Sequence, residues 1–145
     1  MIVNSSAFQH GGEIPRKHGK KFGNVSPQLS WSGAPPETRS YALLMVDTHP
    51  VARGFVHWMV VDTDSATTSL PEGASGSQMP TGAREARPYM GPFPPSGTHD
   101  YEFTVYALDA DSVAVGDADS AESFAAAVRP HALDTGTFVG TFTTM

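Results

Sequence analysis

Proline and glycine constrain the fold of this chain more than any other residues. Twelve prolines and 14 glycines are spread over 145 residues. Proline cannot donate to a central β-ladder and interrupts the interior of a helix, so regular structure is confined to the stretches between prolines. A chain of this length has the size of one ordinary domain. The sequence therefore predicts a loop-rich, mainly β domain over residues 1–145.

The composition excludes several classes of function. The chain has no cysteine, which removes disulfides, thiolate nucleophiles and cysteine metal sites. Its net charge is −6 and its pI is near 5.3, and without a basic stripe we expect no nucleic-acid partner. One basic cluster, Arg16, Lys17, His18, Lys20 and Lys21, lies in a glycine-flanked stretch. A solvated loop is the simpler interpretation of that cluster, and a binding role is the alternative.

The sequence also bears on the subcellular location of the protein. The N-terminal stretch MIVNSSAFQHGGE lacks the charged segment and apolar run of a signal peptide. No window approaches 18 apolar residues, so we expect no membrane span. The default prediction is a cytoplasmic protein, which a removed leader outside this sequence would change.

Apolar patterning predicts mostly strands and one late helix. The predicted strands cover residues 1–8, 29–31, 41–46, 55–61, 101–108 and 137–143. A helix is expected over 119–129, where Asp119 and Glu122 have capping-box spacing and Pro130 stops the helix. Residues 63–98 look irregular, and so long an irregular stretch in a compact domain is often functional. This inventory favours packed antiparallel sheets.

Four polar side chains accompany the apolar strands. By strand alternation Asp47 shares a face with Leu43 and Met45, His57 shares one with Phe55 and Met59, and His99 shares one with Tyr101. Taken singly, each is more often a turn former or a hydrogen-bonded core residue than a functional group.

The combination of these side chains is more informative. If the strands before Asp47 and after Phe55 pair, the carboxylate would hold the imidazole of His57 and raise its pKa. His99 and Tyr101 would then supply further hydrogen-bond donors. Converging donors with few lysines suit a small oxyanion, such as a phosphate monoester or a carboxylate.

Several ordered blocks resemble the phosphatidylethanolamine-binding protein family, which includes Raf kinase inhibitor protein, and most closely its short prokaryotic branch. The blocks are NVSPQLSWSGAPPETRSYALLMVD, VDTHP, FVHWMVVD, GPFPPSGTHDYEFTVYALD and TFVGTFTTM. The fourth is similar to the most specific motif of the family, Gly-Pro-x-Pro-Pro-x-Gly-x-His-Arg-Tyr. The resemblance covers nearly the whole chain.

The resemblance implies a large central antiparallel sheet packed on a smaller sheet, with a peripheral C-terminal helix. It also implies a small anion pocket, which by matched position is lined by Asp47, His57, the Gly91-Pro92 backbone, His99 and Tyr101. We therefore expect a binding protein for a phosphate-like anion or phosphorylated head group, not an enzyme, with no cofactor. Prokaryotic members look like homodimers, so a homodimer is expected here. Members sometimes inhibit protein kinases or serine proteases, which makes such a target an option that the resemblance leaves open.

The chain departs from the family pattern at three positions. Thr48 and His49 replace the first Pro and second Asp of Asp-Pro-Asp-Ala-Pro, and Asp100 replaces the Arg of His-Arg-Tyr. His49 puts a neutral or positive group where the family has a negative one. Asp100 is expected to face away from the pocket, because it lies between His99 and Tyr101.

Two other functions remain open at this point. A metal-dependent hydrolase could use Asp47, His49, His57 and His99 as zinc ligands, although Asp-x-His is a weak motif. No Gly-x-Ser-x-Gly elbow supports serine hydrolysis. A surface-acting inhibitor could instead present residues 63–98 to a protease or kinase.

Overall fold

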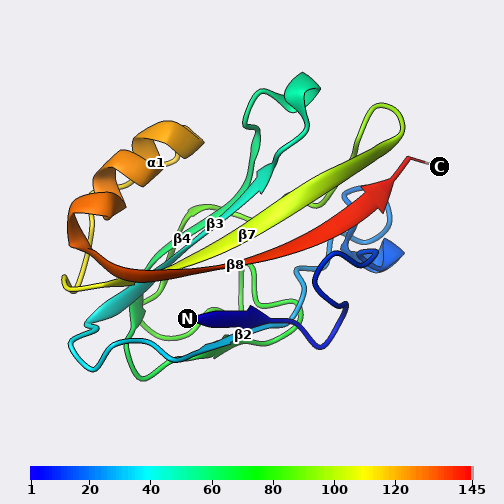
Figure 1. Ribbon diagram of the computed structural model, residues 1–145. Helices are drawn as coiled ribbons and strands as arrows, with labels where there is room; N and C mark the ends of the chain where they lie inside the picture. Colours follow the sequence, from blue (N-terminus) through cyan, green and yellow to red (C-terminus); the bar gives the residue numbers. More distant parts are fainter. Residues whose placement is uncertain (145) are drawn as a thin grey trace.

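The computed structural model describes residues 1–144 and contains two antiparallel sheets (Figure 1). The larger sheet has the strand order β6-β4-β3-β7-β8, and the smaller has the order β1-β2-β5. The larger sheet consists of β3 (Ser40–Asp47), β4 (Val56–Asp64), β6 (Arg84–Arg87), β7 (Thr98–Leu108) and β8 (Ala132–Thr143). The smaller one consists of β1 (Ile2–Asn4), β2 (Leu29–Ser32) and β5 (Ser69–Leu70). The predicted fold class is confirmed.

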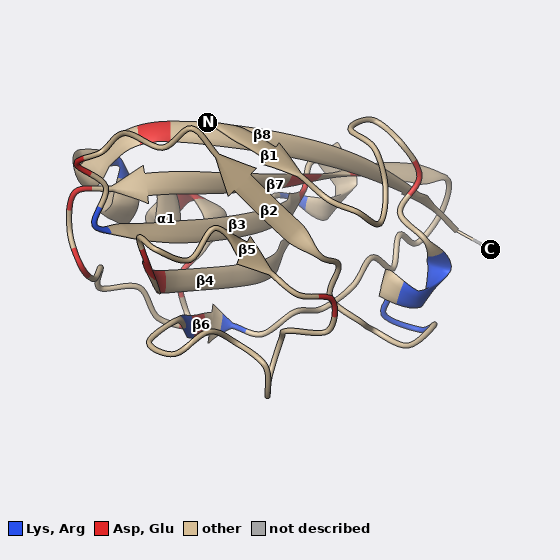
Figure 2. Cartoon of the chain, turned by 90° about the horizontal axis from the view of Figure 1, so that it is seen from below, with Lys and Arg blue, Asp and Glu red and all other residues tan. Residues whose placement is uncertain are grey.

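The main core lies between the two sheets. In Figure 2 the small sheet crosses over the strands of the large one. Leu29 and Trp31 of β2 pack there against Leu43, Met45 and other apolar side chains of the large sheet. The alternation predicted for β7 is confirmed, since its side chains in this core are Tyr101, Phe103, Val105 and Ala107.

The helix α1 (Ala121–Val128) covers the opposite face of the large sheet. Its buried side chains, Phe124 and Val128, belong to a second apolar cluster. The capping box is formed by Ser120 and Ser123, not by the predicted Asp119 and Glu122. Both serine hydroxyls reach backbone N–H groups at the first turn, which an Asp-to-Glu pair one residue earlier would not match in register.

Several strand boundaries differ from the prediction. Residues 63–98 contain β5 and β6, so the stretch is not wholly irregular. The strand β8 begins at Ala132 instead of residue 137, because its polar first half pairs with β7 through Thr135 and Gly136. Pairing with a neighbour, which apolar patterning does not report, sets these ends.

No helix within residues 1–144 has both the length and the apolar character that crossing a membrane requires.

Candidate functional site

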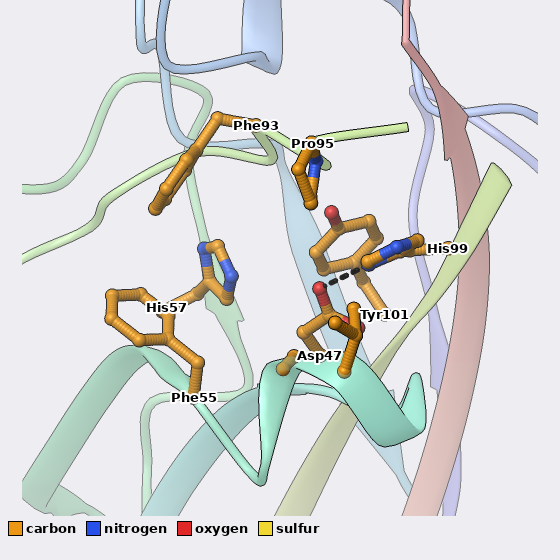
Figure 3. Close-up of a pocket in the computed structure, with 9 residues that line it drawn as sticks. Asp47, Phe55, His57, Phe93, Pro95, His99 and Tyr101 are labelled. Atoms are coloured by element: carbon orange, nitrogen blue, oxygen red, sulfur yellow. Dashed lines mark hydrogen bonds and ion pairs between the residues drawn. The ribbon is translucent and has the colours of Figure 1, made fainter. Parts of the chain in front are cut away.

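A cavity of about 260 Å³ opens at one end of the large sheet (Figure 3). It is lined by Asp47, Val51, Ala52, Phe55, His57, Phe93, Pro95, His99 and Tyr101. The four polar residues singled out from the sequence therefore border one space, although they come from three strands.

Strand register places three of the four polar side chains. In the antiparallel pair of β3 and β7, Asp47 lies directly opposite Tyr101. Side chains of paired residues project to the same face, and His99 shares that face because it is two residues before Tyr101. Asp47 continues the face of Met45, as alternation predicts. The C-terminal end of β3 and the N-terminal end of β7 thus meet at the cavity floor.

A β-bulge directs the fourth side chain, His57, to the same face. Met45 pairs with Trp58 and Val46 pairs with Val56, which leaves His57 as the extra residue in β4. A bulge reorients a side chain relative to strict alternation. The ring of His57 contacts that of Tyr101 edge-on, with centroids 5.1 Å apart. The prediction that His57 shares a face with Met59 is therefore wrong, because Met59 lies in the cluster beneath α1.

The carboxylate of Asp47 holds His99, not His57. Nδ1 of His99 donates to Oδ2 of Asp47 at 2.6 Å, and the backbone N–H of His49 donates to Oδ1 at 2.9 Å. Both side chains are buried. The predicted pairing of Asp47 with His57 is incorrect because β3 pairs with β7 on one side and β4 on the other, and only the β7 side brings Nδ1 within hydrogen-bonding distance.

His57 is instead held by the main chain. Its Nδ1 donates to the carbonyl oxygen of Met90 at 2.5 Å, and the N–H of Met90 donates back to the carbonyl of His57 at 2.8 Å. A carbonyl oxygen can only accept, so Nδ1 carries the proton. Burial lowers the pKa of His57, and the Met90 carbonyl and the charge of Asp47 partly offset that effect. Its Nε2 is turned into the cavity in Figure 3.

The fourth polar group of the site is the hydroxyl of Tyr101. Its side chain is fully buried, and among residues 1–144 its hydroxyl has no hydrogen-bond partner. Burial is the main cause that raises the pKa of Tyr101, and the nearby charge of Asp47 adds to it. The phenol therefore stays protonated at any physiological pH. Leaving a buried hydroxyl without a hydrogen-bond partner costs free energy of folding.

The walls and mouth of the cavity are apolar. Phe55 and Phe93 meet edge-on with centroids 5.6 Å apart, and Phe93 lies 5.6 Å from the ring of His57. Phe55 is 38% exposed and Val51 is 59% exposed. Phe93 and Pro95 lie in the quoted proline-rich block, but nothing in the sequence marked their side chains as lining residues.

Gly91 and Pro92 are not among the residues that line this cavity. The N–H of Gly91 donates to Oδ1 of Asn24 at 2.7 Å, and the carbonyl of Pro92 accepts from the N–H of Lys20 at 3.0 Å. Gly91 also lies near enough to His57 for its backbone to raise the pKa of that ring slightly. These two residues support the loop that carries Met90 and Phe93.

His49 stands behind His99 instead of facing the cavity. The two rings stack with centroids 4.0 Å apart and planes inclined by 7°. Nδ1 of His49 accepts from the N–H of Val51 at 3.1 Å, which requires that nitrogen to be unprotonated. Within residues 1–144 no three His, Asp or Glu side chains are grouped so that they could hold a metal ion. The zinc-site alternative built on Asp47, His49, His57 and His99 is therefore not favoured.

The comparisons with known proteins agree with the resemblance seen in the sequence. The UPF0098 protein YbhB of Escherichia coli is 31% identical over 157 residues, which cover 98% of this chain and 99% of YbhB. LppC of Mycobacterium tuberculosis, which is named as a lipoprotein, is 35% identical over 150 residues, covering 97% of this chain and 73% of LppC.

Two solved structures share the whole fold. The crystal structure of E. coli YbcL, described as a new member of the mammalian PEBP family, superposes with a TM-score of 0.89 at 28% identity. It covers 99% of this chain and 98% of YbcL. CT736 from Chlamydia trachomatis has a TM-score of 0.83 at 29% identity, covering 99% and 97% of the two chains. The family described as phosphatidylethanolamine-binding protein matches residues 4–143, so this chain belongs to the phosphatidylethanolamine-binding protein family.

Proposed function

We propose that this protein binds a small oxyanion, such as a phosphate monoester or a carboxylate, in the cavity between His57 and His99, and that a proton enters with the anion. The observation that carries the proposal is the buried hydroxyl of Tyr101, which has no partner in residues 1–144. A buried donor at a cavity floor that also carries Asp47, His57 and His99 can be satisfied by an anionic oxygen.

Proton uptake follows from how the two imidazoles are held. Each donates through Nδ1, His57 to a carbonyl and His99 to a carboxylate. In a neutral imidazole the other nitrogen, Nε2, is then an acceptor with a lone pair. A lone pair repels an anion, so Nε2 must gain a proton before it can donate to one. Oδ1 and Oδ2 of Asp47 already accept hydrogen bonds, and the carboxylate supplies the counter-charge for an imidazolium at His99.

The proposal also implies that the ligand has an apolar part beside its anionic group. The polar groups lie at the floor, whereas Phe55, Phe93 and Val51 line the walls and mouth. Pockets of this kind use a few polar groups to orient a ligand and apolar contacts to hold the remainder. A phosphorylated head group that extends outward past Phe93 matches this division.

We expect sulfate to bind more tightly as the pH falls through and below about 6.5. Sulfate does not titrate there, so the dependence reports the protein. The pKa of His57 lies below its ordinary value of 6.5 in the free protein, and a bound anion raises it. A proton is therefore taken up on binding between those two pKa values. Calorimetry in two buffers of different ionisation enthalpy measures that uptake directly.

A matched variant and a folding control complete this experiment. His57→Gln should reduce the proton uptake, while His131→Gln, at an exposed site paired with Asp109, should leave it unchanged. Burial also lowers the pKa of His18. As the pH falls, the unfolded state therefore takes up a proton before the folded state does, and the free energy of unfolding decreases below about pH 6.5. Circular dichroism must therefore confirm a folded protein at each pH. An affinity that does not change with pH would refute the coupled proton.

Tyr101→Phe is expected to weaken sulfate binding roughly tenfold while raising the free energy of unfolding by about 1 kcal/mol. The hydroxyl that it removes is buried and unpaired in residues 1–144, so its loss costs the empty protein nothing. Tyr89→Phe is the matched control, because the hydroxyl of Tyr89 donates to the carbonyl of His18 at 2.7 Å. That variant should lose stability and keep its affinity. Urea denaturation and calorimetry give both quantities, and a destabilised Tyr101→Phe would contradict the assignment.

Other expectations stay predictions. Homodimer formation can be checked by light scattering, and a protein kinase or serine protease target by pull-down with cavity variants. The cytoplasmic location also stays a prediction. Because the relative LppC is named as a lipoprotein, cell fractionation is the measurement that checks it.

A further inference from the structure

The cations of this acidic chain are unevenly distributed. Its three lysines, Lys17, Lys20 and Lys21, and one of its six arginines, Arg16, lie in a single segment of six residues, although the net charge is −6. In Figure 2 this segment forms the basic end of the molecule, beside the C-terminus. The sequence favours a solvated loop there, but the contacts show that part of the segment is fixed in place.

Arg16 is held in one orientation by three contacts. Its Nη1 donates to the carbonyl of Thr143 at 2.8 Å, and its guanidinium carbon lies 4.6 Å from the ring centre of Phe142 and 5.4 Å from that of Phe22. None of the carboxylates in residues 1–144 forms an ion pair with it. A guanidinium carries five N–H donors, so most of its fork stays open to a ligand.

A second cavity, of about 130 Å³, adjoins this arginine. Its lining has two cations, Arg16 and Lys21, and no acidic residue, and it also includes Phe22, Phe93, Phe142 and Thr144. Lys17 stands apart from it, since its ammonium pairs with Glu72 at 2.8 Å. Lys20 lies beside it, with its ammonium 4.6 Å from the ring centre of Phe93.

Phe93 is a wall of both cavities, so the two spaces adjoin the same loop. The loop is stiffened by Pro92, Pro94 and Pro95, which reduces the entropy lost when a ligand orders it. The position of Arg16 against the rings of Phe22 and Phe142 lowers the local screening of its charge. A fixed guanidinium and a nearby ammonium are the groups that recognise a planar or tetrahedral oxyanion.

We propose that the cavity between Arg16 and Lys21 is a second oxyanion subsite, which takes a phosphate or carboxylate group. Arg16 supplies directional donors and Lys21 supplies a mobile charge, while the buried ring of Phe142 forms an apolar wall beside Arg16. The subsite does not use His57 or His99, so it stands whether or not the first cavity binds an anion.

The test is a titration of the ¹⁵N-labelled protein at pH 7 followed by NMR, with inorganic phosphate in one series and acetate in another. The amides of Phe22, Phe142 and Thr144 report on the second subsite, and those of His57 and His99 report on the first cavity. The two series show which oxyanion the subsite prefers. Lys21→Gln should weaken binding at the second set roughly tenfold and leave the first set unchanged.

Lys17→Gln is the matched control, because it removes the same charge from the same segment but outside the cavity. It should change the affinity by less than about twofold. Arg16→Gln is the second variant and should abolish the shifts at Phe22 and Thr144, with thermal unfolding used to confirm that it folds. The proposal is overturned if neither anion shifts the second set of amides, or if Lys17→Gln weakens binding as much as Lys21→Gln does.

Discussion

The double substitution His57→Gln/His99→Gln is expected to lower the affinity for sulfate by about 100-fold or more and to remove its pH dependence. Each imidazole, once protonated, gives the anion a charge-assisted hydrogen bond worth about 1.5–3 kcal/mol. Glutamine can still donate, but it cannot take up the proton that neutralises the anion. Because both rings contact one ligand, the two effects do not add fully, which places the expected loss at the lower end of the summed range.

Calorimetry with sulfate near pH 6 measures this loss directly. His131→Gln serves as the control, because His131 is exposed and bonded to Asp109 at 3.0 Å, away from the cavity. A double variant that keeps its affinity within about threefold would show that the anion binds elsewhere. The NMR titration separates that outcome from binding at Arg16 and Lys21, because the two cavities have different reporter amides.

The fold and three of the site positions could be predicted because both depend on alternation within a strand. Tyr101, Phe103 and Val105 point to one side of β7, and the register with β3 brings Asp47 to the same side. Periodicity along a sequence reports the face of each side chain well wherever a strand is regular. His99 falls into place by the same rule.

The partners of the two histidines could not be predicted, because irregular pairing decides them. The bulge at His57 depends on how β4 is registered against β3, and no residue type in FVHWMVVD marks it. The acceptor for Nδ1 of His57 is a main-chain carbonyl 33 residues away, at Met90. Any residue at position 90 would present that carbonyl, so the sequence carries no signal for it.

The hydrogen bonds between loops could not be predicted from the sequence either. The glycines that flank the basic segment favour a solvated loop, with a binding role as the alternative, yet His18 is fully buried and Tyr89 donates to its carbonyl. Those contacts join residues more than 60 positions apart, as Gly91 and Asn24 also do. The resemblance to the family predicts that the backbone of Gly91 lines the pocket. In the structure Gly91 does not line it, and its N–H instead donates to Asn24.

Gly91→Ala is expected to lower the free energy of unfolding by about 3 kcal/mol or more. A Cβ atom at this position would lie 2.0 Å from the carbonyl oxygen of His18 and 2.8 Å from backbone atoms of Gly19 and Lys20. The φ angle of Gly91 is not in the left-handed region, so close approach of two backbones, and not conformational freedom, requires glycine here. No side chain can rotate away to make room.

The substitution should also weaken sulfate binding, although Gly91 is not among the residues that line the cavity. Separating the two loops would strain the bond from Lys20 N–H to the Pro92 carbonyl and shift Met90, whose carbonyl fixes the ring of His57. Gly116→Ala is the control, because its Cβ would meet nothing within 4 Å, and it should be neutral or slightly stabilising. Urea denaturation and calorimetry measure both effects. If Gly91→Ala kept its stability within about 1 kcal/mol of the parent, the contact between these loops could not be what orients His57.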